Sequence, residues 1–300
     1  MDIEADSRRT TKTQLINLLA QRLLASGKRL FSPSDLTEIL AQSRAESHLP
    51  KSLTKDKLLA LAIETKTLLE IQLSVTYPLH TTRYHVGKFT ANELALSLRP
   101  GSYLCHGTAA FLHGVAANHP DFIYANQEQS PKEHSGSLTQ AGLNKAFSSK
   151  QRQSNFIVSY EQTNIMLLSG KHTNRLGVQK IVGTAGDVLE VTNLERTLID
   201  IAVRPGHAGG TENVLQSYRR AIQKTSAEHL AEMLTKLDYV YPYHQAIGFY
   251  LQRAGYDSEL LVGLRMPGLK YDFFLAHGMK KTKFDEDWRV HYPDDLSKSG

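Results

Sequence analysis

Only one cysteine occurs among the 300 residues of the chain, so Cys105 cannot form an internal disulfide. The first six residues are acidic and polar, and they lack the basic start and the apolar core of a signal peptide. A run of roughly 18 apolar residues, the length that a membrane-spanning helix needs, is also missing. We therefore predict a cytoplasmic protein that has no membrane partner.

Catalytic motifs are missing as well. Gly170-Lys171 is similar to the end of a phosphate-binding loop, but Ile165 stands at the position of the upstream glycine. His172 stands where a Ser or Thr would hold magnesium. The carboxylates of residues 285–287 have no preceding Gly-Ser element of the nucleotidyltransferase kind, and a charged turn explains them better. We therefore predict no catalytic residues and no enzymatic activity.

Metal-binding patterns are weak in spite of 13 histidines. None of them forms a His-Glu-x-x-His pattern. Cys105 and His106, together with His113, lack the second thiolate that would make a zinc site persuasive. We predict no metal and no cofactor, and we interpret the histidines as surface or hydrogen-bonded residues.

The composition is that of an ordinary globular chain, with 41% hydrophobic and 22% charged residues. This length and hydrophobic content are sufficient for two domains, each with its own core. The net charge of +5 is unevenly placed, because residues 1–100 carry 14 Lys and Arg against 10 Asp and Glu while the rest is nearly balanced. This asymmetry indicates a polyanion as partner of the first hundred residues.

The first 88 residues contain three helical patterns followed by two strand patterns. Apolar residues recur at helical spacing over residues 12–26, 33–44 and 54–69, and apolar and polar residues alternate over residues 69–75 and 81–86. This order is typical of a winged helix-turn-helix domain, whose third helix enters the DNA major groove beside the hairpin. The connection over residues 45–53 is longer than the usual turn, which leaves the docking angle on DNA open.

Polar and basic side chains gather where such a domain would meet DNA. These residue types bond phosphates and base edges. A solvated helix end would explain any single lysine equally well, but the charge, the element order and the threonine-rich hairpin agree with one another. The predicted DNA contacts are Lys51, Ser52, Thr54, Lys55 and Lys57 of the third helix and Thr81, Thr82 and Arg83 of the hairpin.

Residues 89–300 are predicted to form a second, larger α+β domain. Thr90 and Glu93 form a capping box that begins a short helix, and residues 103–117 predict a tightly packed helix. Residues 126–154 are the most polar part of the chain and are interpreted as an insertion within this domain, with a modest helix over residues 138–148. A disordered linker is the competing interpretation of the same residues.

Residues 121–125 predict a strand before this insertion. Short β-type runs after it, over residues 155–160, 164–168, 178–182 and 188–191, predict a small, mostly antiparallel sheet. A helical C-terminal portion follows over residues 212–224, 227–237 and 241–254, before a final pair of strands at residues 271–275 and 288–292. The expected fold class is therefore α+β, with an N-terminal winged helix-turn-helix and a larger mixed domain.

Residues 191–205 form the best-defined helical pattern of the chain. Thr192 and Glu195 have the spacing of a capping box, and Pro205 ends the helix. Arg196 and Asp200 are spaced as an i,i+4 ion pair. A core helix with a solvated charged edge is the simplest interpretation. We predict that Glu195, Arg196 and Asp200 form a fixed polar cluster where the sheet meets the helices.

Three segments of the sequence resemble the AbiEi family of antitoxins, the DNA-binding half of bacterial type IV toxin-antitoxin and abortive-infection systems. The matching segments are Leu194-Glu195-Arg196-Thr197-Leu198-Ile199-Asp200 with Arg204-Pro205, residues 101–110 with His113-Gly114, and Tyr218-Arg219-Arg220-Ala221. The resemblance implies a winged helix that binds inverted repeats in its own promoter. It also implies a C-terminal domain that counteracts a nucleotidyltransferase-like toxin without a stable complex.

Two functional hypotheses follow from the residues and the resemblance together. The first is an antitoxin and transcriptional autorepressor that binds double-stranded promoter DNA and takes part in phage defence. Here Glu195, Arg196, Asp200, Arg219 and Arg220 mark the antitoxin domain or its contacts, although a solvated helix face also explains Arg219 and Arg220. The alternative is a stand-alone winged-helix regulator with a C-terminal domain that binds a ligand or a protein.

Overall fold

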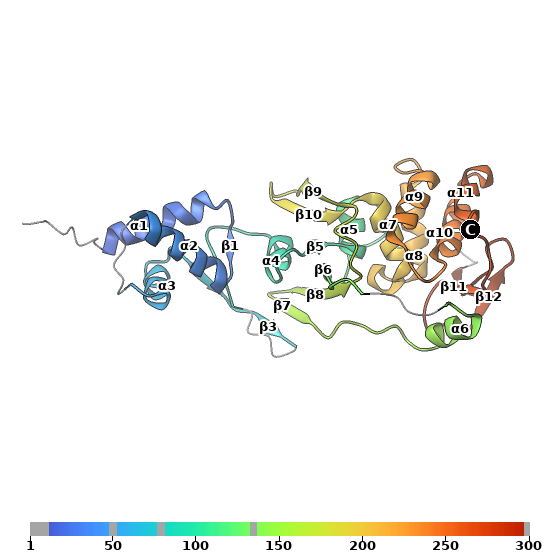
Figure 1. Cartoon of the computed structure of the whole chain (residues 1–300), viewed down its shortest axis with the longest axis horizontal. Coiled ribbons are helices and arrows are strands. Elements are labelled where there is room, and N and C mark those ends of the chain that lie inside the picture. The colour runs from blue at the N-terminus through green and yellow to red at the C-terminus, as the bar shows by residue number, and fades with distance from the viewer. Residues whose placement is uncertain (1–11, 48–52, 77–81, 133–136, 297–300) are drawn as a thin grey trace, which may run out of the picture.

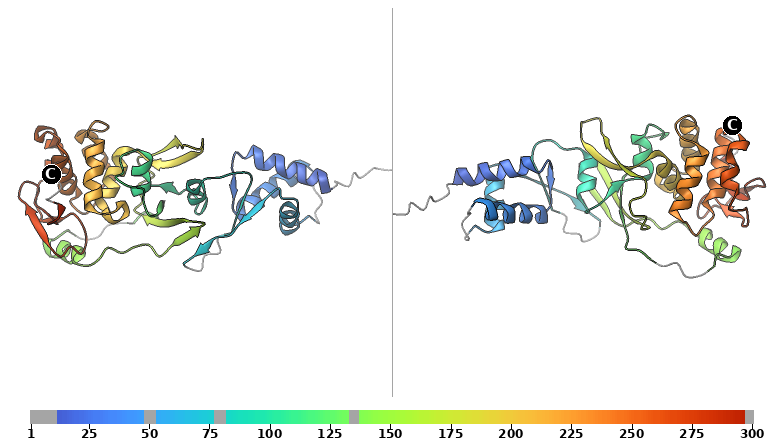
Figure 2. Two further views of the ribbon diagram at one scale, coloured as in Figure 1. Left: turned by 180° about the vertical axis from the view of Figure 1, so that it is seen from behind. Right: turned by 45° about the horizontal axis from the view of Figure 1, so that its top comes forward.

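The computed structural model describes residues 12–47, 53–76, 82–132 and 137–296 and has an α+β fold. It is elongated, with the helices of residues 12–64 at one end and a large sheet with two short helices in the middle (Figure 1). The helices of residues 140–148 and 194–265 lie at the other end. Turning the molecule by 180° shows the same three-part order (Figure 2). The predicted fold class is therefore confirmed at the level of a mixed α+β chain. No helix within the described ranges is long and apolar enough to cross a membrane.

The N-terminal unit packs three helices against a three-stranded antiparallel sheet of order β1-β4-β2. Its core is apolar, with Phe31 and Leu68 fully buried. The prediction that three helices precede any strand is wrong, because Leu30 pairs with His85 to add a strand after the first helix. The elements of the unit are α1 (Lys12–Ala25), β1 (Leu30–Phe31), α2 (Pro33–Ser47), α3 (Lys55–Glu64), β2 (Leu69–Ile71) and β4 (Arg83–His85).

The strand predicted over residues 69–75 is divided between two sheets. Its first half, β2, pairs with β4 in the N-terminal unit. Its second half, β3 (Ser74–Val75), pairs with Val158 and Ser159 of the large sheet. The chain therefore joins the two parts by main-chain hydrogen bonds before it returns to form β4.

Arg83 lies inside the protein, at the junction of the N-terminal unit and α4 (Ala91–Ser97). Its guanidinium donates hydrogen bonds to the carbonyl oxygens of Ser97 at 2.7 Å and Leu98 at 2.9 Å. Burial lowers its pKa, and Asp35 partly offsets this. The prediction of Arg83 as a DNA contact is therefore wrong, since its donors cap the end of α4 and are withdrawn from any partner.

We expect Arg83→Met to reduce the free energy of unfolding by about 1–3 kcal/mol, because buried carbonyl groups at the end of α4 would lose their donors. Urea unfolding followed by circular dichroism measures this change. Arg152→Met, at an exposed position, is the matched control. Equal stability of the two variants would contradict a role of Arg83 in holding the junction.

The large sheet has seven strands in the order β3-β7-β8-β6-β5-β10-β9, so the prediction of a small sheet is wrong. The β6–β8 and β5–β10 pairs are parallel, and the other pairs are antiparallel. Residues 103 and 104, predicted as helix, form β5 instead. The strands after β3 are β5 (Tyr103–Leu104), β6 (Ile123–Glu128), β7 (Ile157–Tyr160), β8 (Thr163–Gly170), β9 (Val178–Val182) and β10 (Val188–Thr192).

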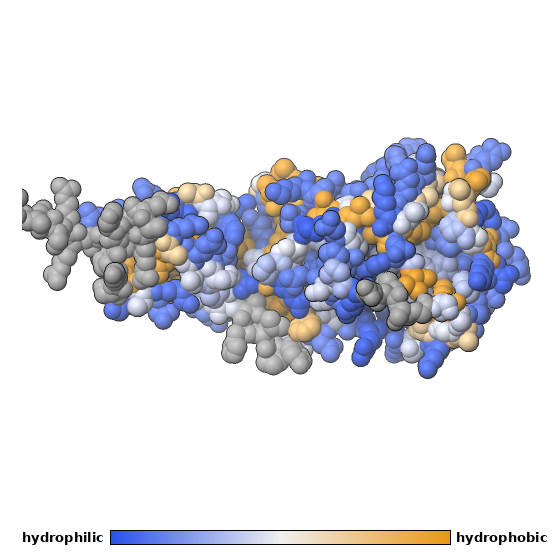
Figure 3. Space-filling view, viewed as in Figure 1, coloured by the Kyte–Doolittle hydropathy of each residue, from blue (hydrophilic) through white to orange (hydrophobic). Residues whose placement is uncertain are grey.

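Helices cover the far end of the molecule and enclose its largest core. Trp288, Tyr218 and Tyr250 are fully buried there, and the ring of Trp288 occupies the space over Gly248. Hydrophilic side chains cover most of the face seen in Figure 3, with smaller apolar areas between them. The main helices are α5 (His106–Leu112), α6 (Gln140–Ser148), α7 (Leu194–Val203), α8 (Thr211–Ala221), α9 (Ala227–Leu237), α10 (Tyr243–Ala254) and α11 (Val262–Arg265). The last strands are β11 (Phe273–Phe274), β12 (Thr282–Asp285) and β13 (Val290–Pro293).

Candidate functional site

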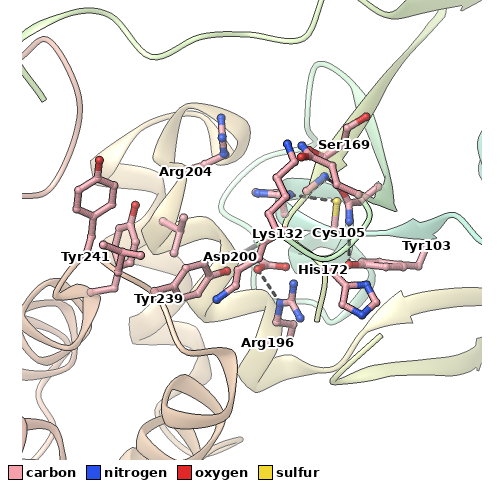
Figure 4. Close-up of a pocket in the computed structure, with 18 of the residues that line it drawn as sticks. Tyr103, Cys105, Lys132, Ser169, His172, Arg196, Asp200, Arg204, Tyr239 and Tyr241 are labelled. Carbon is pink, nitrogen blue, oxygen red and sulfur yellow. Dashed lines mark hydrogen bonds and ion pairs between the residues drawn. The ribbon is translucent and has the colours of Figure 1, made fainter. Parts of the chain in front are cut away.

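A cavity of about 580 Å³ lies where the ends of β6 and β8 meet α7 and the segment that links α9 to α10 (Figure 4). Its lining combines polar and charged side chains with tyrosines. Ligand sites in proteins have volumes of roughly 300–1,000 Å³ and combine apolar walls with a few polar groups. The cavity therefore has the size and the composition of a small-molecule site.

Helix α7 brings a buried ion pair to this cavity. The helix begins after Asn193, whose side chain accepts a hydrogen bond from the backbone N–H of Arg196. The predicted capping box is wrong, because Thr192 ends β10 and its hydroxyl bonds that of Thr197. The carboxylate of Glu195 also differs from the prediction, because it accepts a hydrogen bond from the hydroxyl of Thr225 instead of capping the helix. It does not line the cavity.

Arg196 and Asp200 form the predicted i,i+4 pair, with Nε and Oδ1 separated by 2.8 Å. Their side chains are only 5% and 6% exposed, so the prediction of a solvated charged edge is wrong. The guanidinium also donates to the carbonyl oxygen of Leu176 at 2.9 Å and to Thr173 at 3.2 Å. A fixed polar cluster lies between sheet and helices, as predicted, although Glu195 points elsewhere.

The electrostatics of this pair are set by burial. Burial raises the pKa of Asp200, and the neighbouring Arg196 opposes that rise. For Arg196, burial disfavours the charged form, but Asp200 outweighs it and raises the pKa. Each charge therefore depends on the other to remain ionised in the interior.

A second carboxylate fixes the loop beside the pair. Glu128, at the end of β6, accepts hydrogen bonds from the backbone N–H groups of Thr173 at 2.9 Å and Arg175 at 3.2 Å. The hydroxyl of Tyr103 also donates to it at 3.1 Å. Burial raises the pKa of Glu128, but a hydrogen bond from the Thr173 hydroxyl, together with those already named, outweighs it and lowers the pKa. Glu128 therefore holds the turn that carries Thr173 toward Arg196.

Three further cationic side chains surround the opening. Lys132 and Arg204 are exposed. Lys171 donates hydrogen bonds to the carbonyl oxygens of Leu237, at 2.9 Å, and Asp238. Since Asp200 is the lone carboxylate among the lining residues that the structure describes, the cavity has a positive balance.

A buried histidine pair lies next to the cavity, where His106 belongs to its lining and His207 lines a neighbouring pocket. The rings of His106 and His207 lie 5.0 Å apart, and His207 stacks on Tyr124. Burial lowers the pKa of each histidine to about 3, with Arg204 and the other charges nearby adding to the effect. His106 also lies 3.1 Å from the sulfur of Cys105, and burial raises the pKa of that thiol. Both histidines are therefore neutral near pH 7, and the cysteine stays protonated.

Most predicted DNA contacts that the structure describes lie at one end of α3. Thr54 caps the helix by accepting from the backbone N–H of Lys57. Lys55 is half-buried, Lys57 is exposed, and Thr82 precedes β4. Lys51, Ser52 and Thr81 lie outside the described residues.

Arg219 and Arg220 lie on α8 and do not line the cavity. Arg220 donates to the carbonyl oxygen of Ala116, which attaches α8 to the end of α5. The structure therefore brings Arg196 and Asp200 together and leaves Arg219, Arg220 and Glu195 at other contacts.

Sequence reasoning did not select Lys132, Lys171, Arg204 and Tyr239 as site residues. Lys171 belongs to the Gly170-Lys171 pair that was set aside for lack of a phosphate-loop pattern, and it follows a strand here instead of starting a helix. Arg204 lies within the segment of the family resemblance. The tyrosines gave no signal, because only the packing of α9 and α10 brings them to α7. Among the described residues, no three His, Cys, Asp or Glu side chains form a group that could hold a metal ion.

Comparison with known proteins gives a structural neighbour. No family model matches the chain, and no curated protein matches it. The crystal structure of the RV2827C protein from Mycobacterium tuberculosis is similar, with a TM-score of 0.55 and 15% sequence identity. The match covers 93% of this chain and 91% of that chain. At this identity the likeness concerns the fold alone, and it extends over both parts of the molecule.

Proposed function

We propose that the protein is a DNA-binding regulator whose N-terminal unit is a winged helix-turn-helix. The observation that carries the proposal is the order α1, β1, α2, α3, β2, β4 with an antiparallel sheet β1-β4-β2. Winged helices share this order, with the third helix as the recognition helix and the last two strands as the wing. The excess of basic residues in the first hundred positions supports a polyanion as the partner.

The N-terminal end of α3 is the proposed contact with DNA. Thr54, Lys55 and Lys57 occupy its first turn. Helix N-termini attract phosphates, and lysines neutralise them. Thr82, next to the wing, completes the contact on the described part of the chain. Arg83 has no place in it, because its guanidinium is occupied at α4.

We further propose that the regulator is an antitoxin of the AbiEi type, with its C-terminal domain acting on a nucleotidyltransferase-like toxin. The resemblance over residues 194–205 and 218–221 supports this function. The segment 194–205 forms a buried helix that organises the C-terminal part. The alternative, a stand-alone regulator that responds to a ligand, is favoured by the cavity beside that helix.

We expect the purified protein to shift its own upstream DNA, and the double variant Lys55→Ala/Lys57→Ala to bind at least tenfold more weakly. The salt slope of log K should become smaller by about two units, since each neutralised phosphate contributes roughly 0.9. Gel shifts at several salt concentrations measure both quantities. The double variant Lys180→Ala/Lys236→Ala, at exposed positions of the C-terminal part, is the control.

Equal binding by the α3 variant and the control would contradict the winged-helix contact. The antitoxin half is tested separately by co-expression with the product of the neighbouring gene. Rescue of growth by the full chain is the expected result. A neighbouring gene product that is harmless, or a toxic one that the chain does not neutralise, would leave the stand-alone regulator as the better account.

A further inference from the structure

The inner wall of the cavity holds a donor and an acceptor that the rest of the described chain leaves unused. Arg196 uses Nε for Asp200 and Nη1 for Leu176 and Thr173, while its Nη2 has no hydrogen-bond partner among the described residues. Asp200 accepts through Oδ1, and its Oδ2 likewise has no partner in the described ranges. Both side chains are more than nine-tenths buried, and both line the cavity.

This arrangement presents one guanidinium NH2 group and one carboxylate oxygen to a ligand. Their positions are held by the i,i+4 geometry of α7 and by the loop that Glu128 fixes. Neither atom is among the fully buried atoms without a partner, so the cavity leaves both accessible to a ligand. The matching chemical edge has an amino group next to a hydrogen-bond acceptor.

The opening of the cavity presents a different chemistry. Lys132 and Arg204 are exposed there, on separate segments of the chain, and both line the cavity. Two such cations suit a phosphate group, because guanidinium and ammonium donors pair with its oxygens. The opening therefore suits a ligand that carries negative charge at the end that faces solvent.

The side wall of the cavity is aromatic. Tyr239 and Tyr241 lie on the link between α9 and α10 and line the space beside the ion pair (Figure 4). Lys171 lies 5.5 Å from the ring centre of Tyr239, which helps to hold that ring in place. Flat aromatic surfaces of this kind stack on planar rings, and nucleobases are a common partner.

We propose that the cavity binds a nucleotide whose base carries an amino group. The amino edge of the base bonds Oδ2 of Asp200 and Nη2 of Arg196, the ring lies along Tyr239 and Tyr241, and the phosphates meet Lys132 and Arg204 at the opening. The volume of about 580 Å³ accommodates a mononucleotide. This site is separate from the proposed DNA contact at α3, so each can fail without the other.

The proposal is tested by isothermal titration of the purified full-length chain with nucleoside triphosphates in matched pairs. ATP and GTP are each compared with ITP, and CTP is compared with UTP, because the second member of each pair lacks the amino group. Pyrophosphate is the probe for the phosphates alone. We expect one amino-bearing nucleotide to bind at least tenfold more tightly than its counterpart and than pyrophosphate.

Variants at the opening locate the binding. Lys132→Ala/Arg204→Ala should weaken that nucleotide at least tenfold and leave the circular dichroism spectrum and the thermal midpoint unchanged, since both side chains are exposed. Lys180→Ala/Lys236→Ala, with the same loss of charge, is the control and should bind as tightly as the unmodified chain.

Three results would overturn the proposal. The first is the absence of binding by every nucleotide at about millimolar concentration. The second is equal affinity for both members of every pair, or for pyrophosphate, since the base would then contribute nothing. The third is an equal loss of nucleotide affinity in the opening variant and in its control, because the phosphates would then not bind at the opening. In each case the gel shifts with the α3 variant still test the DNA contact, because that contact is separate from the cavity.

Discussion

We expect Arg196→Ala to reduce the free energy of unfolding of the C-terminal part by about 3–5 kcal/mol. The substitution leaves Asp200 buried without its cation, in a site where burial already raises the pKa of that carboxyl. It also removes the donor to the carbonyl group of Leu176, which lies in the loop between β8 and β9. The loss therefore combines an unpaired buried charge with a broken link between the sheet and α7.

Thermal and urea unfolding, followed by circular dichroism, measure this loss. Arg152→Ala is the matched control, because it removes an exposed arginine. The double variant Arg196→Met/Asp200→Leu should recover part of the stability, since apolar side chains can replace a buried pair once both charges are gone. DNA binding through α3 should survive below the unfolding temperature. If the unfolding midpoint of Arg196→Ala were unchanged, contact with a ligand or a partner would explain this residue better than a role in stability.

A second large effect is expected from acid. The pKa of His106 and of His207 is lowered by burial from 6.5 to about 3, so the native state stays unprotonated while the unfolded chain binds protons below pH 6.5. The contribution of these two histidines to the free energy of unfolding is therefore fully present above pH 6.5 and is lost as the pH falls toward 3. When the pH is lowered from 7.5 to 5.0, each of the two histidines should reduce the free energy of unfolding by about 2 kcal/mol.

Urea unfolding at the two pH values measures this decline. His207→Gln should reduce the loss between them by about 2 kcal/mol, because one of the two buried imidazoles no longer titrates. His229→Gln, on the exposed side of α9, is the control and should leave the loss unchanged. A loss that is identical in all three proteins would contradict the assignment of the acid sensitivity to the pair. The other histidines contribute equally to the loss of unfolding free energy in the unmodified chain and in each variant, so their contribution cancels when these losses are subtracted.

The amphipathic helices could be predicted closely from the sequence. Residues 227–237 are helical as predicted, and Thr54 caps α3 as its sequence context indicated. The capping box of Thr90 and Glu93 is present in full. These features depend on side chains a few residues apart, so that local spacing suffices to specify them.

Features that depend on distant partners could not be predicted in the same way. The strand β1 has only two residues and exists because His85 and Tyr84 pair with it from across the N-terminal unit. The strand predicted over residues 69–75 divides because β7 offers a second edge to its last two residues. The alternation of apolar and polar residues within a segment specifies which face of the strand is apolar, but it does not specify which sheet the strand joins.

The sequence by itself determined that a helix lies within residues 191–205 and that Arg196 and Asp200 lie on one face of it, because both follow from a repeat of 3.6 residues per turn. Only the tertiary structure decided that this face is buried. The ends of β6 and β8 and the tyrosines before α10 line a cavity beside α7, so the Arg196–Asp200 pair becomes the inner wall of that cavity. Solvation depends on what packs against a helix, and that information lies in segments far away in the chain.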